Sequence, residues 1–115
     1  MIEQGQFTLY ATFKAHQGQY EAMKAATLES FALTREAAGL LEVICLEPPK
    51  TELPFVLISI WRSKADFQAF LKSPPMLEYH SQQAVKTMFE TILADATAEF
   101  YTTLDGWTAP AEPVA

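Results

Sequence analysis

The sequence predicts an α+β fold in which strands and helices follow one another in the order β, α, β, β, α, β. Its 115 residues are half apolar and 19% charged, a balance typical of one folded domain. Segments with apolar residues at every second position alternate with segments that have them at every third or fourth position. This is the ferredoxin-like order, which forms a four-stranded antiparallel sheet with its helices on one face.

The first part of the chain predicts a strand, a helix and a second strand. Residues 7–13 alternate large apolar and mixed side chains, so we expect a strand whose odd-numbered residues share one face. From residue 19 to residue 38 the apolar and small side chains step by three or four, which predicts an amphipathic helix of about five turns. Gly39 can take the left-handed conformation that ends many helices, and residues 40–46 predict the second strand.

A loop, a third strand and a short helix follow. Three prolines within residues 47–54 remove backbone donors that a sheet needs, so this segment predicts a loop. Residues 55–61 are apolar on both alternating faces, as expected for a strand that is covered on both sides. Ser63 and Asp66 have the spacing of a capping box, which predicts a helix that starts after Ser63 and ends at Ser73.

The last part of the chain predicts a helix, a strand and a tail. Proline is favoured at the first helical position, so we expect a helix from Pro74 to about Leu93. Residues 98–104 predict the fourth strand. We therefore assign residues 1–106 to a single domain and residues 107–115 to an irregular C-terminal tail.

Charge and cysteine content argue against several classes of partner. The formal net charge of −6 repels phosphate backbones and anionic lipid headgroups, so we expect no nucleic-acid or membrane partner. The longest apolar run, residues 55–61, is far shorter than the roughly 20 residues of a membrane-spanning helix, and no secretory leader opens the sequence. Cys45 is the single cysteine and cannot form an internal disulfide, so we expect a cytoplasmic protein.

The predicted sheet has one face that its own helices do not cover. The strands at residues 7–13 and 55–61 carry large apolar side chains on both faces. Exposed apolar surface of this extent marks an interface or a ligand cavity. We therefore expect a homodimer in which two sheets pack face to face as a dimeric α+β barrel, with a cavity between each sheet and its helices.

The segments at residues 58–64 and 70–73, followed by His80, resemble the antibiotic biosynthesis monooxygenase family, a group of dimeric α+β barrels. The likeness is nearest to the haem-degrading branch of the family. In that branch an Asn, a Trp and a His line the pocket, and the His binds the iron. By this resemblance the His position matches His80, the Trp position matches Phe70, and the Asn position falls near Ala11.

The resemblance also implies a chemistry that needs no tightly bound cofactor. In the cofactor-independent branch, electron-rich phenols or hydroquinones are oxygenated to quinones in an apolar pocket. His80 is the candidate base, because an imidazole titrates near neutral pH. Phe70, Trp61 and Tyr10 are the candidate walls that stack on a small aromatic substrate, with Ala11 beside them.

Two other functions and one structural alternative stay open. One alternative function is the binding or degradation of haem, with His80 as the iron ligand. The other is that of a non-catalytic dimeric module that binds a small apolar molecule. His80 alternatively packs as a core residue whose ring bonds a carbonyl or a carboxylate such as Asp66. His16, the second histidine, is predicted in a solvated turn, so the residues offer no set of ligands for zinc.

Overall fold

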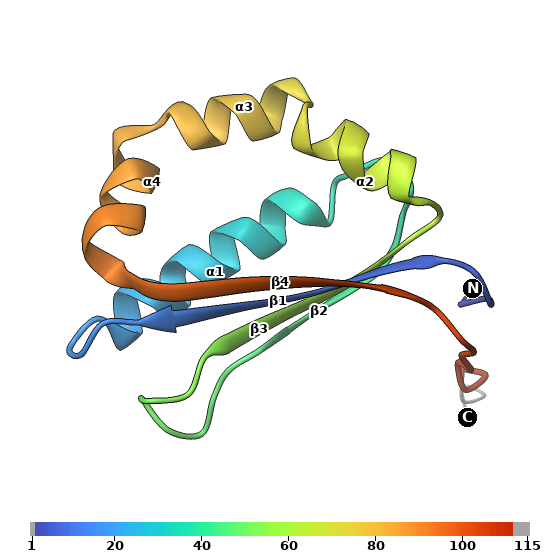
Figure 1. Ribbon diagram of the computed structural model, residues 1–115, viewed down its shortest axis with the longest axis horizontal. Helices are drawn as coiled ribbons and strands as arrows, with labels where there is room; N and C mark the ends of the chain where they lie inside the picture. Colours follow the sequence, from blue (N-terminus) through green and yellow to red (C-terminus); the bar gives the residue numbers. More distant parts are fainter. Residues whose placement is uncertain (1, 112–115) are drawn as a thin grey trace.

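The structure, a computed structural model that describes residues 2–111, is a single antiparallel sheet with all helices on one side (Figure 1). The sheet order is β2-β3-β1-β4. This confirms the predicted α+β, ferredoxin-like fold. The elements are β1 (Phe7–Ala15), α1 (Tyr20–Thr34), β2 (Leu40–Leu46), β3 (Phe55–Trp61), α2 (Lys64–Leu71), α3 (Pro74–Ser81), α4 (Gln83–Thr87), a π-helical turn (Met88–Ile92) and β4 (Leu93–Thr102).

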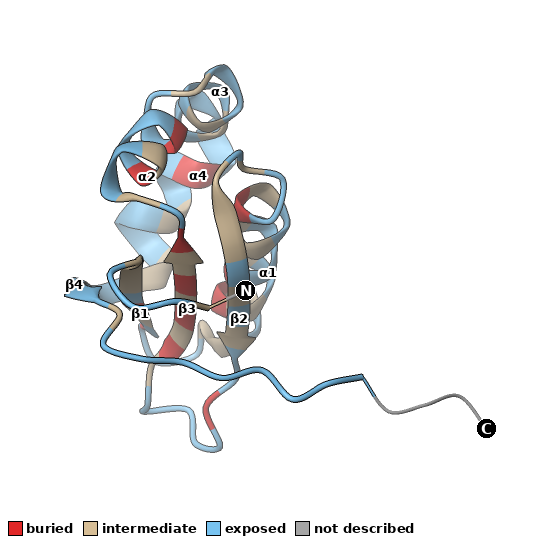
Figure 2. Cartoon of the chain, turned by 90° about the vertical axis from the view of Figure 1, so that its right-hand side faces the viewer, coloured by how far each residue is buried: buried red, intermediate tan, exposed pale blue. Residues whose placement is uncertain are grey.

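Strand register decides which side chains face the helices. Ala11 of β1 pairs with Leu57 of β3 on one side and with Ala98 of β4 on the other. Burial in β3 alternates strictly between buried and half-buried residues, which Figure 2 shows as alternating colours along that strand. The odd-numbered residues of β1 and β3 therefore point toward the helices, and the even-numbered residues form the outer face of the sheet.

The buried core consists of two clusters with space between them. One cluster contains Ala15, Met23 and Phe55, and the other contains Trp61, Phe67 and Phe70. In the second cluster the ring centroid of Trp61 lies 5.3 Å from that of Phe67 and 5.4 Å from that of Phe70. These separations lie within the range of favourable aromatic contacts, so this cluster forms a packed end to the core.

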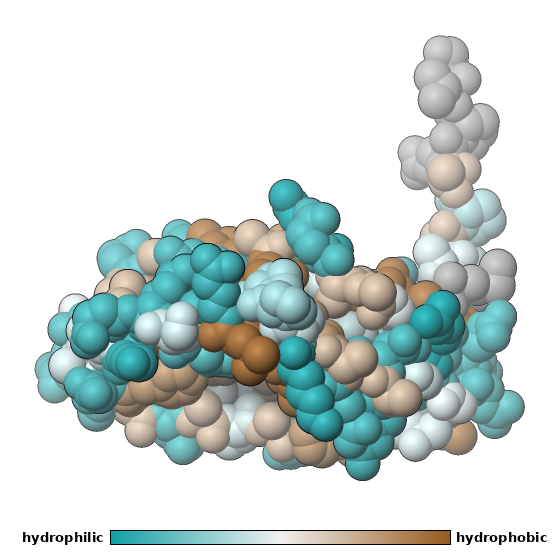
Figure 3. Space-filling view, turned by 90° about the horizontal axis from the view of Figure 1, so that it is seen from above, coloured by the Kyte–Doolittle hydropathy of each residue, from teal (hydrophilic) through white to brown (hydrophobic). Residues whose placement is uncertain are grey.

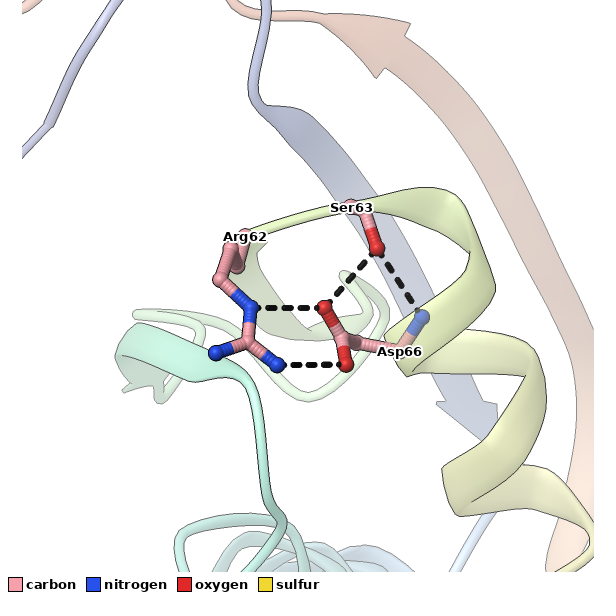
Figure 4. Close-up of polar contacts among 3 residues, drawn as sticks. All are labelled: Arg62, Ser63 and Asp66. Carbon is pink, nitrogen blue, oxygen red and sulfur yellow. Dashed lines mark hydrogen bonds and ion pairs between the residues drawn. The ribbon is translucent and has the colours of Figure 1, made fainter.

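The start of α2 follows the predicted cap (Figure 4). The Ser63 hydroxyl accepts a hydrogen bond from the Asp66 backbone N–H at 3.2 Å and donates to Asp66 Oδ2 at 2.8 Å. Arg62 Nε and Nη2 donate to the two carboxylate oxygens of Asp66 at 3.0 and 2.9 Å. These hydrogen bonds, those from Arg62 foremost, lower the pKa of the Asp66 carboxyl. The cap satisfies backbone donors that the first helical turn leaves free.

The first helix is shorter than predicted. It ends at Thr34, and the next residues form a turn instead of a fifth helical turn. Gly39 has φ +84°, so the predicted left-handed residue is confirmed, but it directs the turn into β2 rather than ending the helix. The Gly39 carbonyl accepts a hydrogen bond from Arg62 N–H at 2.8 Å, and this contact holds the turn against the end of β3.

The predicted long helix from Pro74 to Leu93 is wrong in two respects. The backbone is extended at Gln82, with φ −71° and ψ 141°, and this residue separates α3 from α4. The chain then passes through the π-helical turn and enters β4 at Leu93, five residues earlier than predicted. Leu93 and Asp95 pair with Ala15 and Lys14 of β1, so sheet pairing replaces the last helical turn.

The outer face of the sheet carries no helix. Tyr10, Ile44 and Leu46 are 37%, 52% and 41% exposed. After Thr102 the chain leaves the sheet, and residues 107–111 of the predicted tail form no helix or strand, while residues 112–115 lie outside the described residues. Across residues 2–111, each helix is too short or too polar to cross a bilayer.

Candidate functional site

A cavity of about 170 Å³ lies between the sheet and the helices, where the sequence predicts one. Its walls come from both core clusters, with Met23 at one end and Phe67 and Phe70 at the other. Seen from above in Figure 3, hydrophobic residues show between the mostly hydrophilic residues of the helical side. The cavity wall is mainly apolar, and the side chains that line it include no lysine, arginine, aspartate or glutamate among the described residues.

His80 lines this cavity from α3 and is itself exposed. It therefore lies where the cavity opens to solvent. Its ring centroid is 5.6 Å from that of Tyr79 and 6.3 Å from that of Phe89, so it is placed by aromatic contacts. Asp66 bonds Arg62 and Ser63, and none of the hydrogen bonds or ion pairs found within residues 2–111 joins it to His80. The imidazole thus faces both an apolar chamber and water.

The structure brings four of the five predicted site residues together. Ala11, Trp61, Phe70 and His80 all line the cavity. Trp61 is 0% exposed, because Phe67 and Phe70 pack against it, so it supports the wall more than it presents a surface for stacking. Phe70 is also buried and lies on the inner side of α2.

Tyr10 needs a correction. It is not among the residues that line the cavity, because side chains alternate along β1 and Tyr10 points to the outer face of the sheet. Its partner in the register, Ile58, lies on that same face. Tyr10 therefore cannot stack on a molecule held in this cavity.

Three buried hydroxyls are the polar groups that the sequence-based site lacked. Thr27, Thr34 and Ser59 are the buried polar residues of the described chain, and all three line the cavity. A sequence signal exists for Ser59, because it is the single polar residue at an inward position of the apolar run at residues 55–61. Thr27 and Thr34 belong to the predicted inward stripe of α1, but their hydroxyls carry no signal that separates a binding group from a core residue.

Tyr79 is a further residue beside His80 that the sequence interpretation missed. It lines the cavity from α3 and is half-buried. Burial raises the pKa of its phenol, and the nearby Glu29 carboxylate raises it further. Tyr79 therefore remains protonated at neutral pH, and its O–H is available as a hydrogen-bond donor.

The cavity residues differ from the haem-degrading pocket that the resemblance implies. Ala11 and Phe70 occupy the two positions where the resemblance implies an Asn and a Trp, and neither side chain can donate a hydrogen bond. A cavity of about 150 Å³ holds one benzene. The cavity in this protein measures about 170 Å³, which is only slightly larger and is too small for a porphyrin.

Comparison with known proteins supports this architecture. Protein SO0527 from Shewanella oneidensis has a similar structure, with a TM-score of 0.72 at 21% identity over 92% of this chain and 98% of that chain. Protein PA3566 from Pseudomonas aeruginosa gives 0.71 at 21% identity over 90% and 99%. SnoaB from Streptomyces nogalater, described as a cofactor-independent oxygenase, gives 0.67 at 18% identity over 93% and 99%. At these identities the similarity establishes the fold alone.

No curated protein sequence matches the chain. The sequence model of the family described as "Antibiotic biosynthesis monooxygenase" matches residues 6–82. This match spans β1 to α3 and ends just after His80, so it includes most of the residues that line the cavity. Because it covers more than half of the sequence, the chain belongs to the antibiotic biosynthesis monooxygenase family.

Proposed function

We propose that the protein is a monooxygenase that oxygenates a small aromatic, quinol-like substrate without a tightly bound cofactor, and that His80 is its base. The observation that carries the proposal is the position of His80, which supplies the one imidazole among the described residues that line the apolar cavity, and an imidazole is suited to general-base catalysis. Membership of the monooxygenase family supports the reaction class. SnoaB, which shares the fold, is described as cofactor-independent, and this agrees with chemistry that needs only a base and a dry chamber.

Cavity size favours a substrate with one aromatic ring. An engineered apolar cavity of about 150 Å³ binds benzene, and the cavity beside His80 measures about 170 Å³. Pockets that enclose larger organic ligands measure roughly 300 to 1,000 Å³. A single ring with small substituents therefore fits the space between Phe70 and Ala11 as it stands.

The reaction balances with dioxygen as the one co-reactant. His80 accepts the phenolic proton, and the phenolate transfers one electron to O₂, which gives a phenoxyl radical and superoxide. The two radicals combine at the carbon para to the oxygen, and the imidazolium returns its proton to the peroxide. That carbon then loses its hydrogen as a proton, the O–O bond breaks, and water leaves. One phenol and one O₂ thus give one quinone and one H₂O.

Two alternative functions have less support. His80 could ligate a haem iron, but a haem needs a larger cavity, and the haem-degrading pocket also has an Asn and a Trp where this chain has Ala11 and Phe70. A non-catalytic binding module uses the same apolar walls but gives no reason for an imidazole at the cavity opening. The proposal therefore places a base at His80, a stacking surface at Phe70, and a supporting wall at Trp61 and Ala11.

The proposal includes a homodimer in the cytoplasm. The uncovered outer face of the sheet, with Tyr10 and Ile44 on it, supports face-to-face pairing with a second copy. Cys45 cannot form an internal disulfide, and burial raises the pKa of its thiol, so little reactive thiolate is present. A single thiol without a disulfide partner in the chain, and with a raised pKa, suits a reducing compartment.

Oxygen uptake with a panel of one-ring phenols that have a free para carbon tests the function. We expect His80→Ala to lower kcat/KM by about 10²- to 10⁴-fold, the usual contribution of a general base. His80→Gln should be equally impaired, because an amide can hydrogen-bond but cannot take the proton at neutral pH.

The matched control is His16→Ala. His16 is the other histidine of the chain, is exposed, and does not line the cavity, so its loss should leave kcat/KM unchanged. Turnover by His80→Ala at the wild-type rate would eliminate His80 as the base. Absence of oxygen uptake by the wild type across the panel would count against the reaction class.

A further inference from the structure

The floor of the cavity contains a hydroxyl whose orientation is set by its neighbour. Ser59 is 1% exposed and lies at an inward position of β3. The indole N–H of Trp61 donates a hydrogen bond to Ser59 Oγ at 2.9 Å. One lone pair of the serine oxygen is therefore occupied by a donor whose own ring packs against Phe67 and Phe70.

The Ser59 hydrogen has no acceptor of its own. Among residues 2–111, the bond from Trp61 is the one hydrogen bond found for the Ser59 side chain. Burying an O–H without an acceptor is unfavourable. An oxygen that enters the cavity and accepts this hydrogen bond therefore removes an energetic cost. Ser59 lines the cavity, which places that acceptor inside it.

Two threonines of α1, the helix opposite, can accept hydrogen bonds but have no free hydrogen to donate. Thr27 donates its hydroxyl hydrogen to the Met23 carbonyl at 2.8 Å, and Thr34 donates its own to the Ser30 carbonyl at 2.7 Å. Each hydroxyl has only lone pairs left to offer. Both residues line the same cavity, so it contains a donor on the sheet side and acceptors on the helix side.

The two sides face one another across the cavity. Met23 near the start of α1 packs with Phe55 at the start of β3, and Leu33 near the end of α1 packs with Trp61 at the end of β3. The helix therefore runs along the strand in the same direction. Ser59 on β3 is thus flanked by the part of α1 that carries the two threonines.

We infer that the substrate is a one-ring aromatic with two oxygen substituents: one oxygen accepts the hydrogen bond of Ser59, and a second, hydroxyl oxygen donates to Thr27 or Thr34. Ser59 is a binding residue in this assignment, and Trp61 is a positioning residue that orients it. The inference rests on the proposed function for the reaction, which also requires a free carbon para to one oxygen. Resorcinol (1,3-dihydroxybenzene) has all of these features and serves as the probe.

Anaerobic calorimetric titration tests the inference without any turnover. The probes are resorcinol and 1,3-dimethylbenzene, which has the same shape but no oxygen. We expect Ser59→Ala to weaken resorcinol binding about two- to tenfold, the effect of one hydrogen bond, and to leave 1,3-dimethylbenzene binding unchanged. Ser59→Thr keeps the hydroxyl and should retain the resorcinol affinity.

Two further variants guard against a loss of folding in Ser59→Ala, which also leaves the Trp61 N–H without its acceptor. Thr34→Val combined with Thr27→Val removes both acceptors without touching Trp61, and it should weaken resorcinol more than 3-methylphenol, which has one oxygen. Thr8→Val deletes a hydroxyl on the outer face of β1, where Thr8 bonds Thr103, and should change neither affinity.

Each outcome separates this inference from the proposed function. Equal loss for resorcinol and 1,3-dimethylbenzene in Ser59→Ala would overturn the inference, since it would reflect a change of cavity shape. Unchanged resorcinol affinity together with His80-dependent oxygen uptake would overturn the inference and leave the function standing. Ser59-dependent resorcinol binding without any oxygen uptake would overturn the proposed function and leave the assignment of Ser59 standing.

Discussion

The polar side chains inside this protein are hydroxyls rather than charges, and each one has a partner. No buried side-chain nitrogen or oxygen of residues 2–111 lacks a hydrogen bond. An unsatisfied buried polar group costs about 1 to 3 kcal/mol, so such groups persist only where something satisfies them. Ser59 meets this condition through Trp61 alone, and its unused hydrogen is what distinguishes it from the two threonines of α1.

Individual site residues were predictable to the extent that side-chain direction follows from local periodicity. Alternation along residues 7–13 places Ala11 inward, as found. The same alternation places Tyr10 on the outer face, so the prediction of Tyr10 as a cavity wall was wrong because it did not apply this periodicity. The family resemblance, which the match over residues 6–82 confirms, singled out His80 as the candidate base. Its role as a base stays a prediction. The role of Ser59 depends on a hydrogen bond between side chains, and no sequence pattern reports whether a hydroxyl hydrogen is already used.

The Asp66 carboxyl gives the protein a defined acid sensitivity. Hydrogen bonds from Arg62 and Ser63 lower its pKa in the folded state, whereas an unfolded Asp has a pKa of about 3.9. The folded state therefore binds fewer protons, and the contribution to stability is present above about pH 4 and is lost as the pH falls through the folded pKa. We expect Asp66→Asn to lower the free energy of unfolding at pH 7 and to have a diminishing effect as the pH approaches 3.

Urea unfolding of the wild type and Asp66→Asn at several pH values measures this difference. The same pair of proteins in an Arg62→Gln background serves as the control, because removing Arg62 removes the first cause of the pKa shift. The pH dependence of the difference should become weaker there. A difference that is constant from pH 7 to pH 3 would contradict the assignment.

Among the secondary elements, those with strong local signals were predicted well and those shaped by distant contacts were not. The strands β2 and β3 and the cap of α2 have the predicted positions, since alternation and capping are local. The segment after Ser81 differs because Met88, Ile92 and Leu93 pack against the core cluster around Met23. That packing requires the chain to bend toward the sheet, and helical periodicity alone cannot reveal the bend.

The early start of β4 has a similar cause. Residues 93–97 read Leu-Ala-Asp-Ala-Thr, which lacks the alternating large apolar side chains of a strand signal. Their backbone nevertheless pairs with β1 up to Ala15. Sheet pairing across more than 75 positions of sequence thus overrides a weak local preference, and the irregularity between Lys14 and Ala15 accommodates the end of the ladder.

The turn between α1 and β2 depends on Gly39. Its φ of +84° is unfavourable for other residues, and a Cβ added there would lie 2.5 Å from the Cβ of Asp66. We expect Gly39→Ala to lower the free energy of unfolding by about 2 kcal/mol or more, since left-handed strain of about 1 to 2 kcal/mol adds to a steric clash. Chemical denaturation measures this change.

Gly18→Ala is the matched control for the clash. Gly18 has a nearly equal φ of +82°, but a Cβ at this position meets nothing within 4 Å. Its substitution should therefore show the backbone strain alone, about 1 to 2 kcal/mol. If the two variants lost equal stability, the contact between Gly39 and Asp66 would have no energetic importance.

The molecule as a whole has two layers, and one side of its sheet stays open. The helices cover the inner face of the sheet (Figure 1). The outer face presents an apolar region on neighbouring strands. This outer region consists of Tyr10 on β1, Val56, Ile58 and Ile60 on β3, and Ile44 and Leu46 on β2. Sheets normally bury such a face against a second layer. The second layer in the proposed dimer is the sheet of another copy.

Light scattering at micromolar concentration tests this assembly. The wild type should have twice the 12.9 kDa mass of one chain. Ile58 lies between Tyr10 and Ile44 in the register of the outer region, so Ile58→Lys puts an ammonium group at its centre and should yield a monomer.

Leu28→Lys is the matched control, because Leu28 is 52% exposed on α1, away from the outer face of the sheet, and its substitution should leave the dimer intact. A wild type of 12.9 kDa, or an Ile58→Lys variant that remains dimeric, would contradict face-to-face pairing of the sheets.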